Sequence, residues 1–228
     1  MDNNSAIELS RLMEELIVEN ENHSPDSTKY KPWTSQAAEN AEILFGENGD
    51  FSEPVSLAPF GGLQFPFHSM GNITSVDLFG LDELILFCFY SVNRSRYAAS
   101  VDVGANIGLH SLVMARCGMQ VRSFEPDPAH AEQFRTNMKL NGVTDVVELQ
   151  VAAVSAESGQ TEFVRVLGNT TGSHLKGAKK NPYGELETFP VEVVAVSEAI
   201  QGVRLMKLDA EGEESRILLA MNLDDWAN

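Results

Sequence analysis

The sequence predicts an α/β domain with a mostly parallel, doubly wound sheet, and three stretches support that fold class. Residues 101–108, Val-Asp-Val-Gly-Ala-Asn-Ile-Gly, join a short β-branched strand to a glycine turn, and apolar residues at helical spacing follow them. Residues 120–125 have the pattern of a second strand, which ends in Glu125, and residues 203–209 that of a further strand, which ends in Asp209. Strands that alternate with helices in this way form parallel sheets.

Composition sets the limits of the function. The chain has 228 residues, enough for one domain or one and a half, and 43% of them are hydrophobic, which suffices for a core. The formal net charge is −17, and residues 1–53 alone hold 12 acids but only 3 bases. Such a chain repels phosphates and anionic lipids, so neither nucleic acid nor a membrane is an expected partner. Solubility is the simplest reason for the charge.

Cysteine usage and the N-terminus indicate the compartment. Cys88 and Cys117 have no second Cys or His at metal-ligand spacing, so we expect two buried thiols and no metal site. The first residues are polar and acidic, whereas a signal peptide is basic and then apolar. The longest apolar run, about residues 84–90, is far shorter than the roughly 20 residues that span a bilayer. A soluble, cytoplasmic protein is the expectation.

Residues 1–76 are predicted to form an N-terminal extension without visible chemistry, before a cofactor-binding domain over residues 77–228. An amphipathic helix at its start is expected to pack on the body or on another subunit, so a homo-oligomer stays open. The predicted elements up to the first strand of the sheet are a helix over 5–19, a linker over 20–35, a short helix over 37–45, a hairpin over 55–67 with Gly61-Gly62 at its turn, and a buried helix over 78–90.

The glycine turn and Glu125 together predict a nucleoside ligand. Gly104 allows the backbone to bend, and Gly108 allows the start of the next helix to lie close to a ligand or to the sheet. Glu125 is 21 positions after Gly104, near the spacing of roughly 20 between a glycine turn and the acid that binds a ribose diol. The fingerprint G-x-G-x-x-G is absent because Asn106 replaces its middle glycine, which favours a cofactor without a pyrophosphate.

The middle of the domain adds two candidate features. A helix is expected from Pro126-Asp127-Pro128 to about residue 140, followed by a third strand over 146–154. Ala152 and Ala153, at the end of that strand, are small enough to leave room for an adenine ring, although plain core packing explains them equally well. Two further strands are expected over 161–166 and 188–196, joined by a loop over 168–185 that is a lid, a substrate loop or disordered.

The fourth strand carries the candidate catalytic residues. Alternation places Lys207 and Asp209 on one side of it, and Asp209 lies at its carboxyl end, where open α/β sheets bind their ligands. We expect Asp209 to orient the substrate or to accept its proton, with Lys207 beside it and His174 arriving from the long loop. Capping of the turn at residues 210–212 is the alternative role for Asp209.

These stretches, in this order, resemble the FkbM family of S-adenosylmethionine-dependent methyltransferases over about residues 77–221. The resemblance rests on Val-Asp-Val-Gly-Ala-Asn-Ile-Gly-Leu-His-Ser from residue 101, Phe-Glu-Pro from 124, Ala-Ala-Val-Ser from 152, Gly-Ser-His-Leu from 172 and Lys-Leu-Asp-Ala-Glu-Gly-Glu-Glu from 207. It implies a Rossmann-like class I methyltransferase fold and methyl transfer to a hydroxyl group of a sugar, polyketide or other small metabolite. The candidate residues for binding S-adenosylmethionine are Asp102, Gly104, Ala105, Asn106, Gly108, Glu125, Pro126, Ala152 and Ala153.

Two alternatives remain beside this interpretation. The same glycine turn could serve an enzyme that binds NAD or a nucleotide sugar, although the missing middle glycine argues against it. The family's sheet normally continues with three more strands, whereas this chain stops at residues 224–228, where the fifth strand should begin. We therefore expect a C-terminally truncated domain whose fourth strand has an exposed edge, and a non-catalytic fragment that binds the cofactor stays open.

Overall fold

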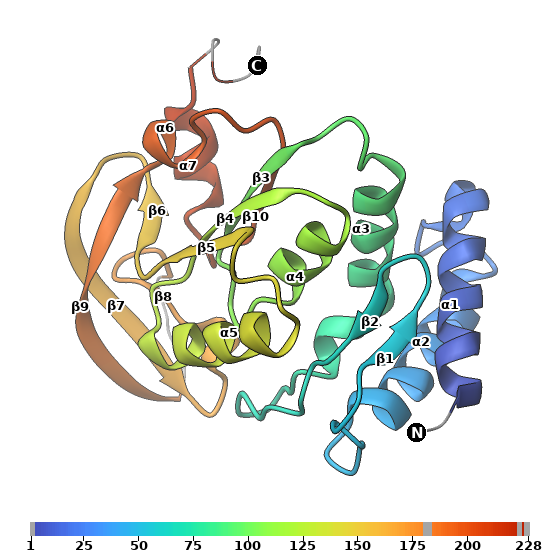
Figure 1. Cartoon of the computed structure of the whole chain (residues 1–228). Helices are drawn as coiled ribbons and strands as arrows, with labels where there is room; N and C mark the ends of the chain where they lie inside the picture. Colours follow the sequence, from blue (N-terminus) through green and yellow to red (C-terminus); the bar gives the residue numbers. More distant parts are fainter. Residues whose placement is uncertain (1–2, 180–183, 223–224, 226–228) are drawn as a thin grey trace. The chain divides into compact units, whose positions relative to one another are not determined.

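The computed structural model describes residues 3–179, 184–222 and 225. The chain divides into two compact units, Met1–Ser95 and Arg96–Asn228, which are described separately as the N-terminal and C-terminal units (Figure 1). The domain boundary predicted after residue 76 stays a prediction.

The N-terminal unit begins with two long helices. Helix α1 (Asn3–Val18) confirms the predicted amphipathic helix and buries the side chains of Leu9, Leu12 and Leu16. The linker predicted over residues 20–35 is wrong from residue 30 onward, because helix α2 runs over Tyr30–Phe45. A short 3-10 turn, η1 (Asn20–Asn22), precedes it. Pro32 had suggested a linker, but it lies in the first turn of α2, where a backbone N–H has no partner within the helix and its loss is tolerated.

A hairpin and a third helix complete this unit. Strands β1 (Val55–Leu57) and β2 (Gly61–Leu63) pair antiparallel, so the chain reverses at residues 58–60 and the prediction of Gly61-Gly62 as the turn is wrong. Gly61 has a φ of 77° and already pairs with Leu57. Helix α3 (Leu81–Val92) follows a 3-10 turn, η2 (Asp77–Phe79), and Gly80 in extended conformation separates the two elements. Cys88 of this helix is buried, as predicted.

The C-terminal unit contains a four-stranded parallel sheet, which confirms the α/β class. Its strand order is β10-β3-β4-β5, and every pairing in it is parallel. Among the described strands, β10 is at the end of this order and pairs with β3. The strands are β3 (Ala99–Val103), β4 (Gln120–Phe124), β5 (Val147–Gln150) and β10 (Met206–Leu208).

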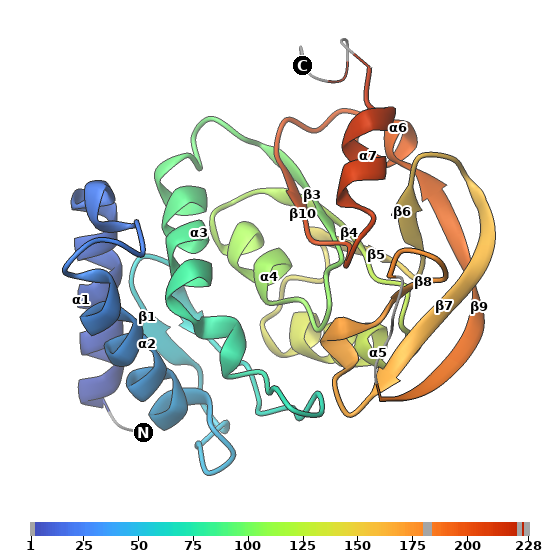
Figure 2. The same ribbon diagram turned by 180° about the vertical axis from the view of Figure 1, so that it is seen from behind.

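Helices cover the two faces of this sheet. Val101 and Val103 of β3 are buried in an apolar cluster with Ile217 of α7, while Asp102, which alternates with them, points toward α4 and bonds to Ser111 there. Helix α5 lies toward the viewer in Figure 1, and α7 lies toward the viewer in Figure 2. The helices are α4 (Leu109–Arg116), α5 (Pro128–Leu140), α6 (Val196–Ala199) and α7 (Glu214–Ala220).

A second sheet, which is mixed, departs from the single doubly wound sheet that the sequence predicts. Its order is β6-β9-β7-β8, with β6 parallel to β9 and the other pairs antiparallel. The strands are β6 (Ala153–Ser155), β7 (Gly159–Leu167), β8 (His174–Leu175) and β9 (Glu185–Ala195).

Two sequence predictions are corrected by this sheet. The predicted third strand is divided, because the chain bends at Ala152, whose N–H bonds to Gln150 O at 3.0 Å, and leaves the parallel sheet for the mixed one. The predicted long loop contains a 3-10 turn, η3 (Thr170–Gly172), and strand β8. Its residues 180–183 lie outside the described part of the chain.

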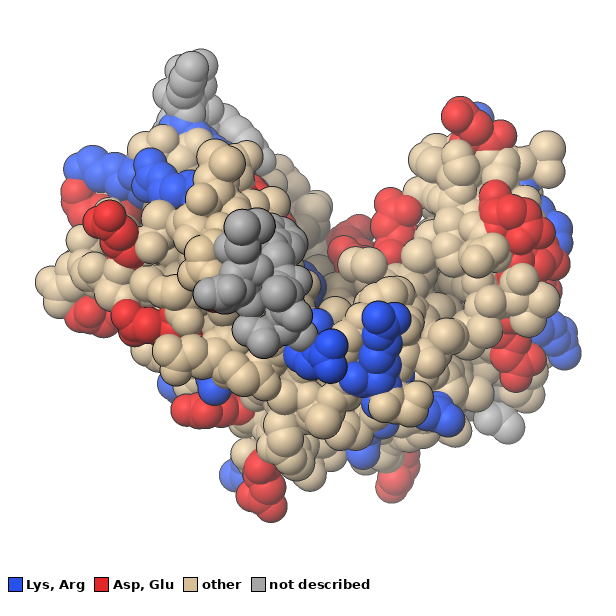
Figure 3. All heavy atoms as spheres, turned by 90° about the horizontal axis from the view of Figure 1, so that it is seen from above, with Lys and Arg blue, Asp and Glu red and all other residues tan. Residues whose placement is uncertain are grey.

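The surface of the described residues carries both charges, as expected from the composition. In the view of Figure 3, acidic side chains occur on both sides, and a group of basic side chains lies near the centre. Within the described ranges, none of the helices combines the length and the apolar character needed to cross a bilayer. The same residues include no group of three or more His, Cys, Asp or Glu arranged to hold a metal ion.

Candidate functional site

The glycine turn after β3 lies directly against the chain that leaves β10. Gly104 has a φ of 73°, and the N–H groups of Gly104 and Ala105 donate to Phe124 O at 3.0 and 2.9 Å. A Cβ atom at Gly104 would lie 1.8 Å from the backbone oxygen of Asp209. Position 104 therefore requires glycine for two reasons, a left-handed backbone and contact with a second strand end. The second reason cannot be read from the local sequence.

Glu125, at the end of β4, is held by backbone amides beside this turn. Its side chain is buried, and its Oε2 accepts a hydrogen bond from Asn106 N at 2.8 Å, while its Oε1 accepts one from Asp127 N at 2.9 Å. A carboxylate has about four acceptor positions, so each oxygen can accept one more hydrogen bond. Two hydroxyl donors on neighbouring carbons, as in a ribose, match the two remaining acceptor positions.

Asn106 offers a second acceptor at the same place. It has a φ of 51°, a left-handed conformation that Asn adopts more readily than most residues, and its Oδ1 is buried without a hydrogen-bond partner among the described residues. Buried acceptors are normally paired, so this atom fits a site that receives a donor from a bound molecule. The residues of the turn thus fit the nucleoside part of S-adenosylmethionine.

Gly108 lies directly against helix α5, and its role in cofactor binding stays a prediction. It has a φ of 93°, and a Cβ there would lie 2.7 Å from Phe134 Cδ2 and 2.9 Å from Met138 Cε, both on α5. Asn137 of the same helix donates to Ile107 O at 2.8 Å. Helix α5 therefore fixes the far end of the turn, a role that the spacing of the glycines does not reveal.

Lys207 lies between two carboxylates at the edge between β10 and β3. The parallel register places it opposite Asp102, and its Nζ is 3.5 Å from Asp102 Oδ1 and 3.7 Å from Asp209 Oδ2. The same Nζ donates to Gly104 O at 2.9 Å. Asp102 is fully buried and accepts from Ser111 Oγ at 2.6 Å. The structure thus brings Asp102, Lys207 and Asp209 together beside the glycine turn, as the sequence predicts.

The two carboxylates differ in exposure, and this suggests different roles. The side chain of Asp209 is 63% exposed, whereas that of Asp102 is fully buried. A buried carboxylate beside a lysine is a structural charge pair, while an exposed one can reach a substrate. The turn at residues 210–212 is capped by Glu214, whose carboxylate accepts from Ala210 N at 2.8 Å and from Gly212 N at 2.9 Å. The capping role considered for Asp209 is therefore filled by another residue.

The remaining candidates are Pro126, which follows β4, and three residues in or beside the mixed sheet. Ala152 is fully buried at the link between the two sheets, and Ala153 belongs to the apolar cluster of the mixed sheet. Pro126 separates Glu125 from Asp127. His174 is buried in β8, with its Nδ1 3.1 Å from Gly172 O. Cofactor contacts of Pro126, Ala152 and Ala153 and a catalytic His174 stay predictions.

An ion pair connects the segment that follows His174 to the turn after β10. Lys179 Nζ donates to Glu211 Oε2 at 2.5 Å and to Gly172 O at 3.1 Å. A Cβ at Gly212 would lie 3.2 Å from Ala178 O, so the two backbones are close there. Residues of the predicted long loop therefore lie beside the turn that follows Asp209.

Sequence reasoning missed a polar cluster behind Glu125. Arg165 of β7 donates from Nε and Nη2 to the two carboxylate oxygens of Asp127, at 2.7 and 2.5 Å. Burial alone would raise the pKa of Asp127, but the hydrogen bonds from Arg165, the nearby His130 and the N–H of Ala129 outweigh it and hold the pKa below its ordinary value of 3.8. Only the prolines around Asp127 gave a local signal, and it indicated a helix start.

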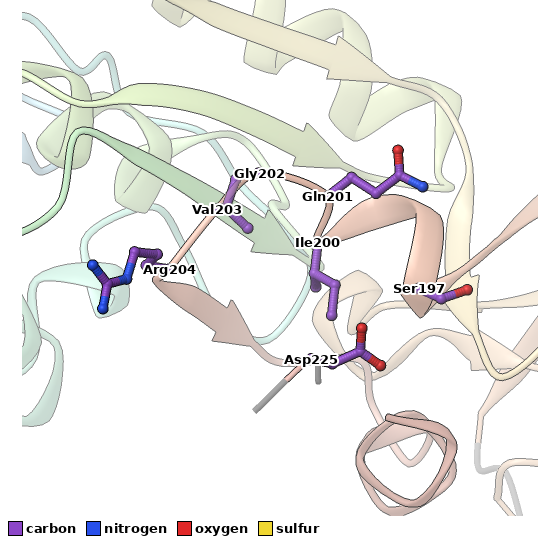
Figure 4. A pocket seen from close by; sticks show the side chains of 7 residues that line it. All are labelled: Ser197, Ile200, Gln201, Gly202, Val203, Arg204 and Asp225. Atoms are coloured by element: carbon purple, nitrogen blue, oxygen red, sulfur yellow. The ribbon is translucent and has the colours of Figure 1, made fainter. Parts of the chain in front are cut away.

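Two cavities lie at the opposite end of the parallel strands. One of about 650 Å³ is formed where α6 connects to β10 (Figure 4), and its lining residues include Ile200, Val203 and Arg204. Another of about 380 Å³ is lined by residues at the amino ends of β3 and β4, among them Ser100 and Arg122. Parallel sheets bind their ligands at the carboxyl ends of the strands, where the glycine turn and Glu125 lie. These cavities are therefore separate from the candidate cofactor site.

Comparison with known proteins shows the family of this chain. The model of the Methyltransferase FkbM domain matches residues 102–227. Methyltransferase 1 of Beauveria bassiana (strain ARSEF 2860) is 30% identical over 147 residues, which cover 55% of this chain and 59% of that protein. Methyltransferase sdnD of Sordaria araneosa is 27% identical over 174 residues, which cover 61% of this chain and 66% of that protein. The chain thus spans less than two thirds of the length of either relative.

A solved structure with the same family name was also found. The methyltransferase FkbM from Methylobacillus flagellatus KT is 18% identical, with a TM-score of 0.36, over 54% of this chain and 28% of that one. That score is too low to support an argument about the site, so the assignment rests on the family model, which covers more than half of the sequence. The chain belongs to the FkbM methyltransferase family.

Proposed function

We propose that this chain is the cofactor-binding part of an S-adenosylmethionine-dependent methyltransferase that acts on a hydroxyl group of a small metabolite, sugar or polyketide. The observation that carries the proposal is the Glu125 carboxylate at the end of β4, which is held by the N–H of Asn106 from the glycine turn. The membership in the FkbM family and the names of the two relatives support it.

The cofactor would lie along the carboxyl ends of β3 and β4. Glu125 would accept the two ribose hydroxyls, and Asn106 Oδ1 would accept a donor in place of the partner that it lacks. When bound, S-adenosylmethionine supplies an electrophilic methyl group on a positively charged sulfur. The turn contributes position rather than covalent chemistry, because alignment of two reactants is itself a large part of the rate.

Asp209 is the proposed base for the acceptor. Methyl transfer would replace the sulfur–methyl bond by an oxygen–methyl bond and release the hydroxyl proton, which the exposed carboxylate of Asp209 would accept. Lys207, whose Nζ is 3.7 Å from Asp209 Oδ2, holds that carboxylate beside the turn. Because an alcohol is a weak acid, we expect orientation of the hydroxyl to matter more than its full deprotonation.

Calorimetry tests the cofactor. We expect S-adenosylhomocysteine to bind the wild-type chain and Glu125→Ala to weaken that binding by about tenfold or more, because two hydrogen bonds to a charged group are lost. Glu148→Ala, which removes an exposed acid from the neighbouring strand β5, is the matched control and should leave affinity unchanged. Preferential binding of NAD, or unchanged affinity in Glu125→Ala, would contradict the proposal.

Turnover with a panel of hydroxyl acceptors tests Asp209. Asp209→Asn keeps the volume and the hydrogen-bonding capacity but cannot accept a proton, so kcat should fall roughly 100-fold or more while affinity for S-adenosylhomocysteine and melting temperature stay the same. Glu211→Gln, two residues away, is the control. Normal turnover in Asp209→Asn would remove it from catalysis, and cofactor binding without any turnover in the wild type would favour a binding fragment.

A further inference from the structure

The carboxylate proposed to bind the ribose is supported by side chains that belong to the mixed sheet. Asp127 and His130 both contact Glu125, and each is held in turn by a residue from beyond the parallel sheet. Those two residues are Arg165 of β7 and Thr170 of η3. The ribose-binding role of Glu125 rests on the proposed function, and these contacts bear on what sets the position of its carboxylate.

The first connection runs through Asp127. Its side chain is 1% exposed. Arg165 donates two hydrogen bonds to it, from Nε to Oδ2 at 2.7 Å and from Nη2 to Oδ1 at 2.5 Å. The same carboxylate accepts from Ala129 N at 2.8 Å and thereby caps helix α5. With its side chain fixed on two sides, Asp127 has little freedom to turn its backbone N–H, which donates to Glu125 Oε1 at 2.9 Å.

The second connection runs through His130. Its Nε2 is 2.9 Å from Thr170 Oγ1, and its Nδ1 is 3.7 Å from Glu125 Oε1. The side chains of His130 and Glu125 are 7% and 6% exposed, so water does not readily take the place of either contact. One imidazole thus links the ribose-binding carboxylate to the segment between β7 and β8.

We infer that Asp127, His130 and Arg165 are positioning residues for Glu125, so that the mixed sheet sets how strongly the site binds a ribose diol. None of the three has to contact the cofactor for this role. Arg165 also donates to Glu187 Oε2 at 2.6 Å and lies over the ring of Phe189, with 4.7 Å between its guanidinium carbon and the ring centroid. Arg165 of β7 is therefore also held by residues of β9.

The experiment compares two ligands, S-adenosylhomocysteine and its 2′,3′-dideoxy analogue, by calorimetry. Glu125 discriminates between them only if its two oxygens face the diol, so the affinity ratio reports its position. We expect Arg165→Met and His130→Gln each to reduce the ratio by about fivefold, mainly through weaker binding of S-adenosylhomocysteine. A residue that only stabilises the fold would change both affinities equally and leave the ratio constant.

Lys176→Met is the matched control, since Lys176 lies next to β8 and pairs with the exposed acid Glu162. It should leave the ratio unchanged. Circular dichroism and thermal melting establish that each variant is folded, and Thr170→Val, the mildest change in the cluster, gives the same test if Arg165→Met or His130→Gln fails to fold. An unchanged ratio in the folded variants would overturn the inference.

Failure of the proposed function gives a different result. If the wild-type chain binds neither ligand, or binds both equally, then Glu125 does not hold a ribose diol and the proposed function itself is wrong. If the wild type discriminates and Glu125→Ala does not, the site is established and the ratios of the Arg165 and His130 variants decide the inference alone.

Discussion

The two sheets of the C-terminal unit contribute to the candidate site in different ways. The parallel sheet supplies a backbone turn and carboxylates at the ends of its strands, Glu125 and Asp209. The mixed sheet supplies Arg165, which pairs with Asp127, whose N–H donates to Glu125. Strand β3 is buried on both faces, while β9 is exposed along its first half. A strand covered on both faces carries its ligand groups at its ends, and a strand with a free face can use its side chains along its length.

The difference predicts that changes in the parallel sheet act on the fold itself, while changes in the mixed sheet act mainly on the position of side chains. The close contact of Gly104 with the chain at Asp209 is between backbone atoms, which have little room to move. Contacts of the mixed sheet with the site are ion pairs and hydrogen bonds between side chains, which tolerate rearrangement. The following predictions test that contrast.

Gly104→Ala should have the largest effect. Its new Cβ would overlap the backbone oxygen of Asp209 at 1.8 Å and would also force a left-handed alanine, so we expect a loss of about 4 kcal/mol or more in the free energy of unfolding and no cofactor binding. Urea denaturation and calorimetry measure the two effects. Gly118→Ala is the control, because Gly118 has a φ of 87° and open space around it and should cost only about 1–2 kcal/mol. Equal losses in both variants would show that backbone conformation, not the contact between strands, explains position 104.

Asp127→Asn should have an intermediate effect that depends on pH. The pKa of Asp127 in the fold is below its ordinary 3.8, so its ionised form stabilises the fold above about pH 4, and this contribution is lost as the pH falls through the lowered pKa. Asparagine still caps a helix but cannot pair with Arg165. We expect the variant to be less stable by about 1–3 kcal/mol at pH 7, with a difference that shrinks below pH 4. Urea titrations at several pH values measure it, and a constant difference would contradict the assignment.

Lys179→Met should have the smallest effect. The side chains of Lys179 and Glu211 are 32% and 37% exposed, and an ion pair open to solvent contributes roughly 0–1 kcal/mol. The melting temperature should therefore change little, and the small difference should disappear in high salt. A loss comparable to that of Gly104→Ala would show that this side-chain pair stabilises the fold as strongly as the backbone contact at position 104 does.

Much of the parallel sheet could be predicted because its signals are local. The strand, glycine turn and helix from residue 99 to 116, the strand that ends before Glu125 and the helix start at Asp127 all follow from adjacent residues. The mixed sheet was predicted only as separate strands. Its pairing joins β6 to β9 and β7 to β8, and no local pattern distinguishes a strand that continues from one that changes sheets at Ala152.

The sequence by itself determined the order of elements, the turn at Gly104 and the carboxylate at Glu125. It also placed Lys207 and Asp209 beside each other. These features follow from hydrophobic periodicity, from a glycine and from position at the end of a strand, all of which are properties of short segments. Only the tertiary structure decided that Asp209 backbone excludes any side chain at position 104, that Phe134 requires Gly108, and that Arg165, 38 residues along the chain, pairs with Asp127. These are contacts between distant segments, and their identity depends on which surfaces meet when the sheets pack.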